Sequence, residues 1–69
     1  MARQFSSAQI TRALERHGFV FVSQRGSHMK FKSRGGTART VIVPAGRKSL
    51  PVGTLKAIAR QAGLRLEEL

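Results

Sequence analysis

Hydrophobic and polar positions follow helical spacing at both ends of the chain and strand spacing in its middle. Residues 6–17 carry an apolar stripe at intervals of three and four, which predicts a helix with one buried face: Ile10, Ala13, Leu14 and His17. Ser6 or Ser7 can cap its first amides, and Gly18 follows as a left-handed terminator. We interpret His17, in the last turn, as a structural residue rather than a catalytic one.

The middle of the chain predicts three strands, over residues 19–23, 27–34 and 39–43. The first is a short run of β-formers that is apolar on both faces, and its phenylalanines are expected to pack rather than to stack on bases. The second alternates cationic and apolar side chains, which is typical of a half-buried strand. Arg25-Gly26 and Gly35-Gly36 supply tight turns, and Pro44 ends the third strand. The strands therefore form an antiparallel meander.

A second helix is predicted from Leu50 or Pro51 to Ala62, because its apolar side chains again share one face. Each helix has a single apolar face, so both must pack on the same side of the sheet. The expected fold class is α+β, a two-layer α-β-β-β-α domain with a three-stranded antiparallel sheet. In the middle strand this arrangement turns Met29 and Phe31, with Ser27, toward the helices. It turns the opposite set toward solvent: His28, Lys30, Lys32 and Arg34.

Charge and composition limit the kinds of partner that such a domain can bind. Of the 69 residues, 13 are Lys or Arg and 3 are Asp or Glu, and a net charge of +10 indicates a polyanionic partner. Nucleic acid is the leading candidate, and an acidic protein or an anionic membrane surface are the others. The chain has no cysteine and no ligand-spaced cluster, so neither a metal nor a cofactor is expected. No apolar run approaches the ~20 residues of a membrane span, and a cytoplasmic location is expected.

The open face of the middle strand carries the candidate chemistry. His28 is the one plausible general base on it, and Arg25, Lys30 and Lys32 can stabilise negative charge on a phosphate. Gly26 lets a nucleic-acid backbone approach closely, and Arg34, Arg47 and Lys48 are further expected RNA contacts. Spacing by itself also fits a polar surface histidine on a solvated cationic face, with a mobile basic loop at residues 47–48.

Several motifs resemble the HicA toxins of bacterial HicA–HicB toxin–antitoxin systems. They follow one another in order over roughly residues 7–64: His17-Gly18-Phe19, Gly26-Ser27-His28 with Phe31, Val43-Pro44, Leu50-Pro51-Val52-Gly53-Thr54-Leu55, Ile58, and Gln61-Ala62-Gly63-Leu64. The resemblance implies a double-stranded-RNA-binding-domain-like fold, and the length of 69 residues predicts a single domain over residues 1–69. The resemblance also implies an mRNA endonuclease (an mRNA interferase) whose essential histidine is His28, masked by a HicB-like antitoxin.

The chain departs from many relatives at two positions, with Met29 and Ala45-Gly46 where those relatives carry further histidines. A second imidazole near His28 is therefore not available for proton transfer. Two functions follow from the sequence: a metal-independent endoribonuclease toxin, and a non-catalytic basic RNA-binding module of the same fold. A basic adaptor for an acidic protein or a membrane surface is a third possibility.

Overall fold

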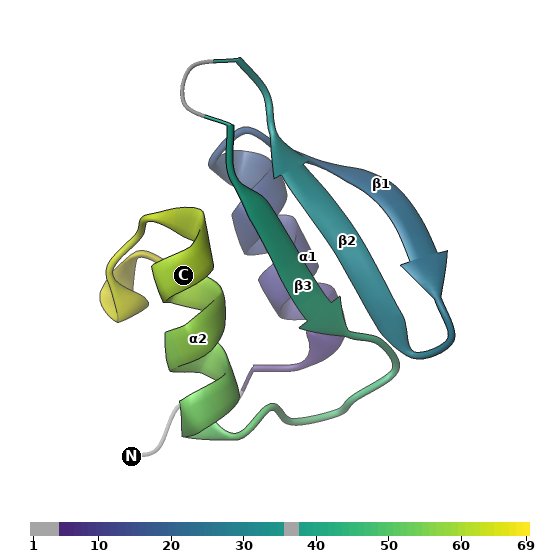
Figure 1. The fold of residues 1–69 in the computed structure, drawn as a ribbon. Coiled ribbons are helices and arrows are strands. Elements are labelled where there is room, and N and C mark those ends of the chain that lie inside the picture. Colours follow the sequence, from purple (N-terminus) through teal and green to yellow (C-terminus); the bar gives the residue numbers. More distant parts are fainter. Residues whose placement is uncertain (1–4, 36–37) are drawn as a thin grey trace.

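Two helices and three strands form in the order that the spacing of apolar residues predicts. The structure is a computed structural model and describes residues 5–35 and 38–69. The elements are α1 (Ser7–Arg16), β1 (Phe19–Arg25), β2 (His28–Ser33), β3 (Thr40–Pro44), α2 (Val52–Ala62) and the 3₁₀ turn η1 (Leu66–Glu68). In Figure 1, α1 lies behind the sheet and α2 beside β3, so the front face of the sheet is uncovered. The two-layer α+β fold with a double-stranded-RNA-binding-like order is therefore confirmed.

Local signals explain where each helix begins and ends. Ser6 caps α1 in a reciprocal capping box with Gln9, whose backbone N–H donates to Ser6 Oγ at 3.1 Å. The second helix begins at Val52, slightly later than the sequence suggests, because Pro51 has an extended backbone (φ −59°, ψ 151°). It ends at Gly63, whose φ of +72° is the left-handed conformation predicted for that glycine.

The sheet has the order β1-β2-β3, with both neighbours of β2 antiparallel to it. Strand β1 continues to Arg25, two residues beyond the prediction, because its register shifts at Val22 and the last residues resume pairing. Pro44 is the last residue of β3 rather than the residue after it, which an edge strand tolerates. Gly36 of the predicted Gly35-Gly36 turn lies outside the described residues.

One hydrophobic core joins both helices to the inner face of the sheet. Its fully buried side chains are Ile10, Leu14, Phe31, Val41, Val43 and Ile58. Met29 is half-buried against this core, so the inward orientation predicted for Met29 and Phe31 is confirmed. Phe19 is buried as expected, whereas Phe21 is 52% exposed and packs edge-on against Phe31 at the rim of the core.

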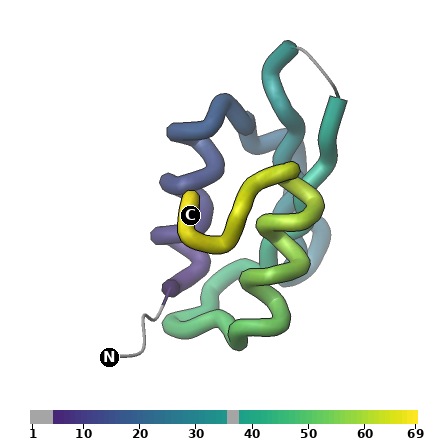
Figure 2. Tube along the Cα trace, turned by 90° about the vertical axis from the view of Figure 1, so that its left-hand side faces the viewer, coloured from purple at the N-terminus to yellow at the C-terminus, as the bar shows by residue number. Residues whose placement is uncertain are grey.

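Contacts between residues far apart in the sequence hold α2 to β3 and the C-terminal segment to α1. The Gln61 side chain accepts a hydrogen bond from the Ile42 backbone N–H (2.9 Å), which satisfies a donor on the outer edge of β3. The C-terminal segment runs back from α2 toward α1 (Figure 2) and buries Leu69 in the core. His17 Nε2 donates to the Glu68 carbonyl oxygen at 2.9 Å, which supports the structural role predicted for His17.

The loop after β3 is held by Ser7, a buried polar residue at the start of α1. Its hydroxyl donates to the Pro44 carbonyl oxygen at 2.5 Å and accepts from the Arg47 backbone N–H at 3.0 Å. Its own N–H donates to the Arg47 carbonyl oxygen at 2.9 Å. Because Pro44 pairs with His28 across β2–β3, Ser7 also supports the backbone beside the candidate site.

We expect Ser7→Ala to lower the free energy of unfolding by about 1–2 kcal/mol, because it leaves a part-buried carbonyl and a part-buried N–H without their partner. Urea denaturation measures the change. Ser49→Ala is the matched control, since Ser49 is exposed, and its effect should stay within about 0.5 kcal/mol. Equal stability of the two variants would contradict the role assigned to Ser7.

Candidate nucleic-acid interface

The β1–β2 hairpin places His28 at the start of the central strand. Arg25 pairs with His28 across a two-residue loop of Gly26 and Ser27. Gly26 has φ +57°, which favours glycine, and the following residue has no positive φ, a pattern that fits a type II′ turn. Ser27 is exposed in this turn, so the expectation that it faces the core is wrong, because the alternation of β2 begins only at His28.

His28 lies between two neighbours, with Arg25 across from it on β1 and Pro44 on β3. Its side chain is exposed, and no hydrogen bond to it is found within residues 5–35 and 38–69. The backbone around it is nevertheless fixed by strand pairing and by the Ala45 N–H, which donates to the Ser27 carbonyl oxygen at 2.7 Å. The imidazole is therefore open to a ligand while its backbone is held in place.

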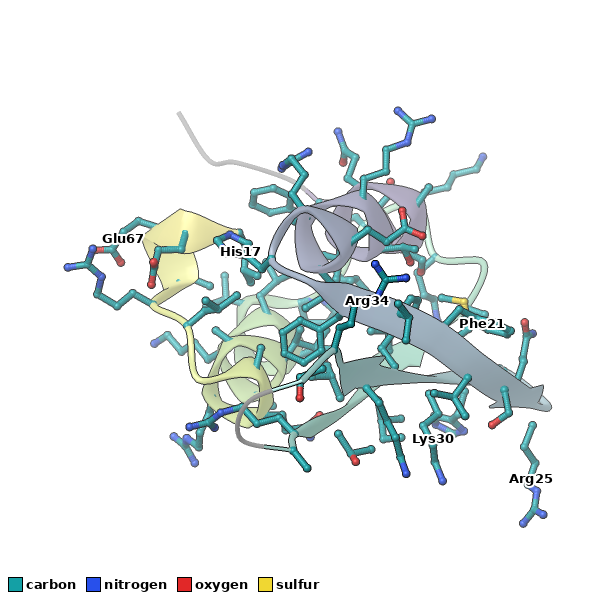
Figure 3. All side chains as sticks on the ribbon, turned by 90° about the horizontal axis from the view of Figure 1, so that it is seen from above. His17, Phe21, Arg25, Lys30, Arg34 and Glu67 are labelled. Carbon is teal, nitrogen blue, oxygen red and sulfur yellow. The ribbon has the colours of Figure 1, made fainter. Side chains whose placement is uncertain are left out.

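Lys30 and Lys32 are exposed on the same side of β2 as His28, as the alternation predicts. Lys30 lies between Ser23 on β1 and Ile42 on β3, and Lys32 lies between Val20 and Thr40. In Figure 3, Lys30 and Arg25 extend from the sheet away from α1. The open face thus presents a row of cations along its central strand.

A depression of about 300 Å³ lies on this face near the β1–β2 turn, lined by Ser23, Arg25, His28, Lys30 and Ile42. All three strands contribute to it. Sequence reasoning missed Ser23 and Ile42. The alternation of Ile42 between two buried valines could have placed it on the open face. The placement of Ser23 depends on the register shift in β1, which no local signal in the sequence indicates.

The electrostatic character of the open face is uniformly positive. The three acids of the chain are Glu15 in α1 and Glu67 and Glu68 in η1, so the sheet contains none. The ion pair found among the described residues joins Arg65 to Glu68 at 3.5 Å, far along the chain from β2. A hydrogen bond from the Arg65 backbone N–H lowers the pKa of the Glu68 carboxyl. The cations near His28 therefore have no carboxylate partner and can bind a polyanion.

Of the predicted RNA contacts, Arg25 and Lys30 line the depression, whereas Gly26 and Lys32 do not line it but lie next to residues that do. The remaining three lie elsewhere. Arg34 follows the end of β2 and lines a second depression with Glu15, Gly18 and Phe21, on the α1 side of the sheet (Figure 3). It is therefore not part of the row formed by Lys30 and Lys32, because the strand alternation ends at Ser33. Arg47 and Lys48 are exposed in the loop between β3 and α2, and their part in binding RNA stays a prediction.

This arrangement can bind a phosphate and transfer a proton beside it. A neutral imidazole accepts a proton, and the flanking guanidinium and ammonium groups can stabilise charge on a phosphoryl oxygen. No group of three or more His, Cys, Asp or Glu side chains that could hold a metal ion occurs in the part of the chain that the structure describes. Nor does any described helix have the length and apolar character needed to cross a membrane.

Comparison with known protein families gives one match. A family model described as "HicA toxin of bacterial toxin-antitoxin" matches residues 7–64 of the chain. The matched range covers both helices and all three strands, including the His28 strand and the Gln61 contact that closes the β3 edge. No curated protein matches the chain.

We expect Gly26→Ala to lower the free energy of unfolding by about 1–2 kcal/mol, because a φ of +57° is unfavourable for alanine. A Cβ at this position would meet no atom within 4 Å, so the cost comes from the backbone conformation and not from a clash. Thermal denaturation measures the change. Gly53→Ala in α2 is the control, since its Cβ is equally unobstructed and alanine favours a helix, so stability should hold or rise by up to about 1 kcal/mol. A neutral Gly26→Ala would mean that the turn does not require glycine.

Proposed function

Because this chain belongs to the HicA toxin family of bacterial toxin–antitoxin systems, we propose that it is a metal-independent endoribonuclease that cleaves mRNA with His28 as general base. The observation that carries the proposal is the position of His28. It is an exposed imidazole on a paired strand, in a depression that it shares with Arg25 and Lys30, two cations for which no ion pair is found among the described residues. A phosphodiester of single-stranded RNA fits this combination of charge and proton acceptor.

The reaction proceeds through the RNA's own 2′-hydroxyl. His28 removes the proton from that hydroxyl, and the 2′-oxygen attacks the adjacent phosphorus. The bond from phosphorus to the 5′-oxygen breaks, and the leaving oxygen takes a proton from water or from Lys30. The products are a 2′,3′-cyclic phosphate and a 5′-hydroxyl. Arg25 and Lys30 bind the phosphate oxygens, which gain negative charge in the transition state.

The absence of a second histidine in the sheet limits the rate of this reaction. One general base contributes about 10²–10⁴-fold to a rate, so a slow enzyme is expected. The partner is expected to be a HicB-like antitoxin that covers the basic face. A protein whose net charge is negative would complement that face best.

A non-catalytic RNA-binding module is the second candidate. It is favoured by the same feature that limits the rate, since the depression contains one imidazole and no other side chain that is a common proton acceptor near neutral pH. This function would use the cations of the open face in the same way. The two candidates differ in one observable, because the binding module leaves the RNA intact.

We expect His28→Ala to reduce cleavage of a single-stranded RNA by about 10²–10⁴-fold with little change in affinity, because it removes the proposed proton acceptor and leaves Arg25 and Lys30 in place. Gel analysis with end-group detection measures the rate and the cyclic phosphate. Activity of the wild type should persist in excess chelator. His17→Gln is the control, since His17 contacts Glu68 and lies outside the depression, and it should cleave normally at a temperature where it is folded. Normal cleavage by His28→Ala would rule out the catalytic assignment.

Binding to RNA should weaken steeply with salt, because each phosphate contact releases counterions. We expect Lys30→Gln to reduce the slope of log affinity against log salt concentration by about one unit. Lys56→Gln, on the exposed side of α2, removes the same charge away from the open sheet face and should leave the slope unchanged. Fluorescence anisotropy measures both. Equal slopes for the two variants would place the RNA elsewhere on the molecule.

A further inference from the structure

The pairing of β1 with β2 changes by one residue near the middle of β1. Phe21 lies opposite Phe31, but the next pair is Ser23 with Lys30, followed by Gln24 with Met29 and Arg25 with His28. Val22 has no partner in this ladder and its side chain is 47% exposed. This is a β-bulge, in which one strand carries an extra residue.

The bulge decides which side chains of β1 share a face with His28. Side chains alternate along a strand, so in an unbroken β1 that starts from buried Phe19 the odd-numbered residues would all face the helices. Ser23 and Arg25 would then lie against the helix layer, and Gln24 would lie beside His28. The bulge reverses the alternation after Val22. Phe21 can still pack on Phe31 while Ser23 and Arg25 turn to the open face.

We propose that the bulge at Val22 assembles the substrate site by turning Ser23 and Arg25 toward His28, and that the Ser23 hydroxyl donates a hydrogen bond to a phosphate oxygen of the bound RNA. The proposal rests on the proposed ribonuclease function and extends it to a substrate contact. Arg25 and Ser23 form the β1 wall of the depression, facing His28 and Lys30 on β2.

Ser23 suits this role because its donor is free and its neighbours are cations. No hydrogen bond to its side chain is found among the described residues, and the side chain is exposed in the depression. Hydroxyl groups and guanidinium groups are common ligands of RNA phosphates. A hydroxyl also donates at short range without adding charge, so it can bind an oxygen that lies between Arg25 and Lys30.

The first test exchanges two neighbouring residues. The double variant Gln24→Arg/Arg25→Gln has the same composition and net charge as the wild type but carries its guanidinium on the helix side of β1. We expect kcat/KM for RNA cleavage to fall by at least about tenfold, since a charged hydrogen bond to the phosphate is lost. An unbroken strand predicts the reverse, because residue 24 would then face His28. Unchanged or increased cleavage by the folded double variant would overturn the proposal.

The second test removes the Ser23 hydroxyl. We expect Ser23→Ala to lower kcat/KM by at least about tenfold, because the phosphate oxygen is charged and a hydrogen bond to a charged group is worth more than a neutral one. Thr40→Val is the matched control, because Thr40 is exposed on the same face opposite Lys32 but does not line the depression. Its kcat/KM should stay within about twofold. Equal kcat/KM for Ser23→Ala and the wild type would remove Ser23 from the site. Circular dichroism melting confirms that each variant is folded at the assay temperature.

Failure of this proposal can be told apart from failure of the proposed function. Suppose that the wild type cleaves RNA and His28→Ala does not. Activity of the Gln24/Arg25 double variant equal to that of the wild type would then contradict the bulge proposal and leave the proposed function intact. If the wild type does not cleave, the test compares the affinities of the wild type and the Gln24/Arg25 double variant for a 2′-deoxy oligonucleotide instead of their cleavage rates. The same affinity for both, or no binding by either, overturns the proposal. Cross-strand nuclear Overhauser contacts measure the register directly. With the bulge, Arg25 contacts His28 and Ser23 contacts Lys30. Without the bulge, the contacts to His28 and Lys30 would come from Gln24 and Val22 instead.

Discussion

Burial of Phe31 in the centre of the sheet determines which face of β2 meets solvent. The Phe31 side chain is 0% exposed and lies between Phe21 on β1 and Val41 on β3. The Phe21 ring packs edge-on against it, with 5.7 Å between the two ring centroids. Because side chains alternate along a strand, burying this ring places His28 and Lys30 on the opposite side. Removing a buried phenylalanine side chain costs about 3–5 kcal/mol, a large part of the stability of a small domain. Fold stability and the position of the site therefore depend on the same strand register.

The parts of this structure that local patterns determine could be predicted from the sequence. The alternation of Lys30, Phe31 and Lys32 identifies both the strand and its buried face. The apolar stripes identify both helices, and two layers follow because each stripe must be covered. The position of His28 on the open face needs no further information, since it lies an odd number of residues from Phe31.

The parts that depend on pairing between distant segments could not be predicted. The bulge at Val22 is a property of the β1–β2 ladder, and it reverses the face of Ser23 and Arg25. The Ser7 contacts with Pro44 and Arg47 join residues about 40 positions apart, and nothing in a single serine indicates them. Arg34 was predicted from a strand alternation that ends one residue before it. Each of these features comes from tertiary structure overriding local periodicity.

The proposed nuclease has a single imidazole among cations, so it would rely on charge more than on paired acid–base groups. Arg25 and Lys30 border the same depression as His28, so the proposed ribonuclease would use the same side chains for binding and for transition-state stabilisation. Gln61 closes the β3 edge with a hydrogen bond, whereas β1 carries exposed Val20 and Phe21 along the open edge of the sheet. The resulting domain is small, and its candidate site is confined to one face of the sheet.

The most direct test of this account is to map RNA binding on the protein itself. Backbone amide chemical shifts are followed by NMR as a non-cleavable 2′-deoxy oligonucleotide is added at low salt. The account predicts that the largest changes fall on the open face, at Ser23, Arg25, His28 and Lys30, and that α2 changes little. Changes concentrated on α2 or on the 47–48 loop, with β2 unaffected, would contradict it.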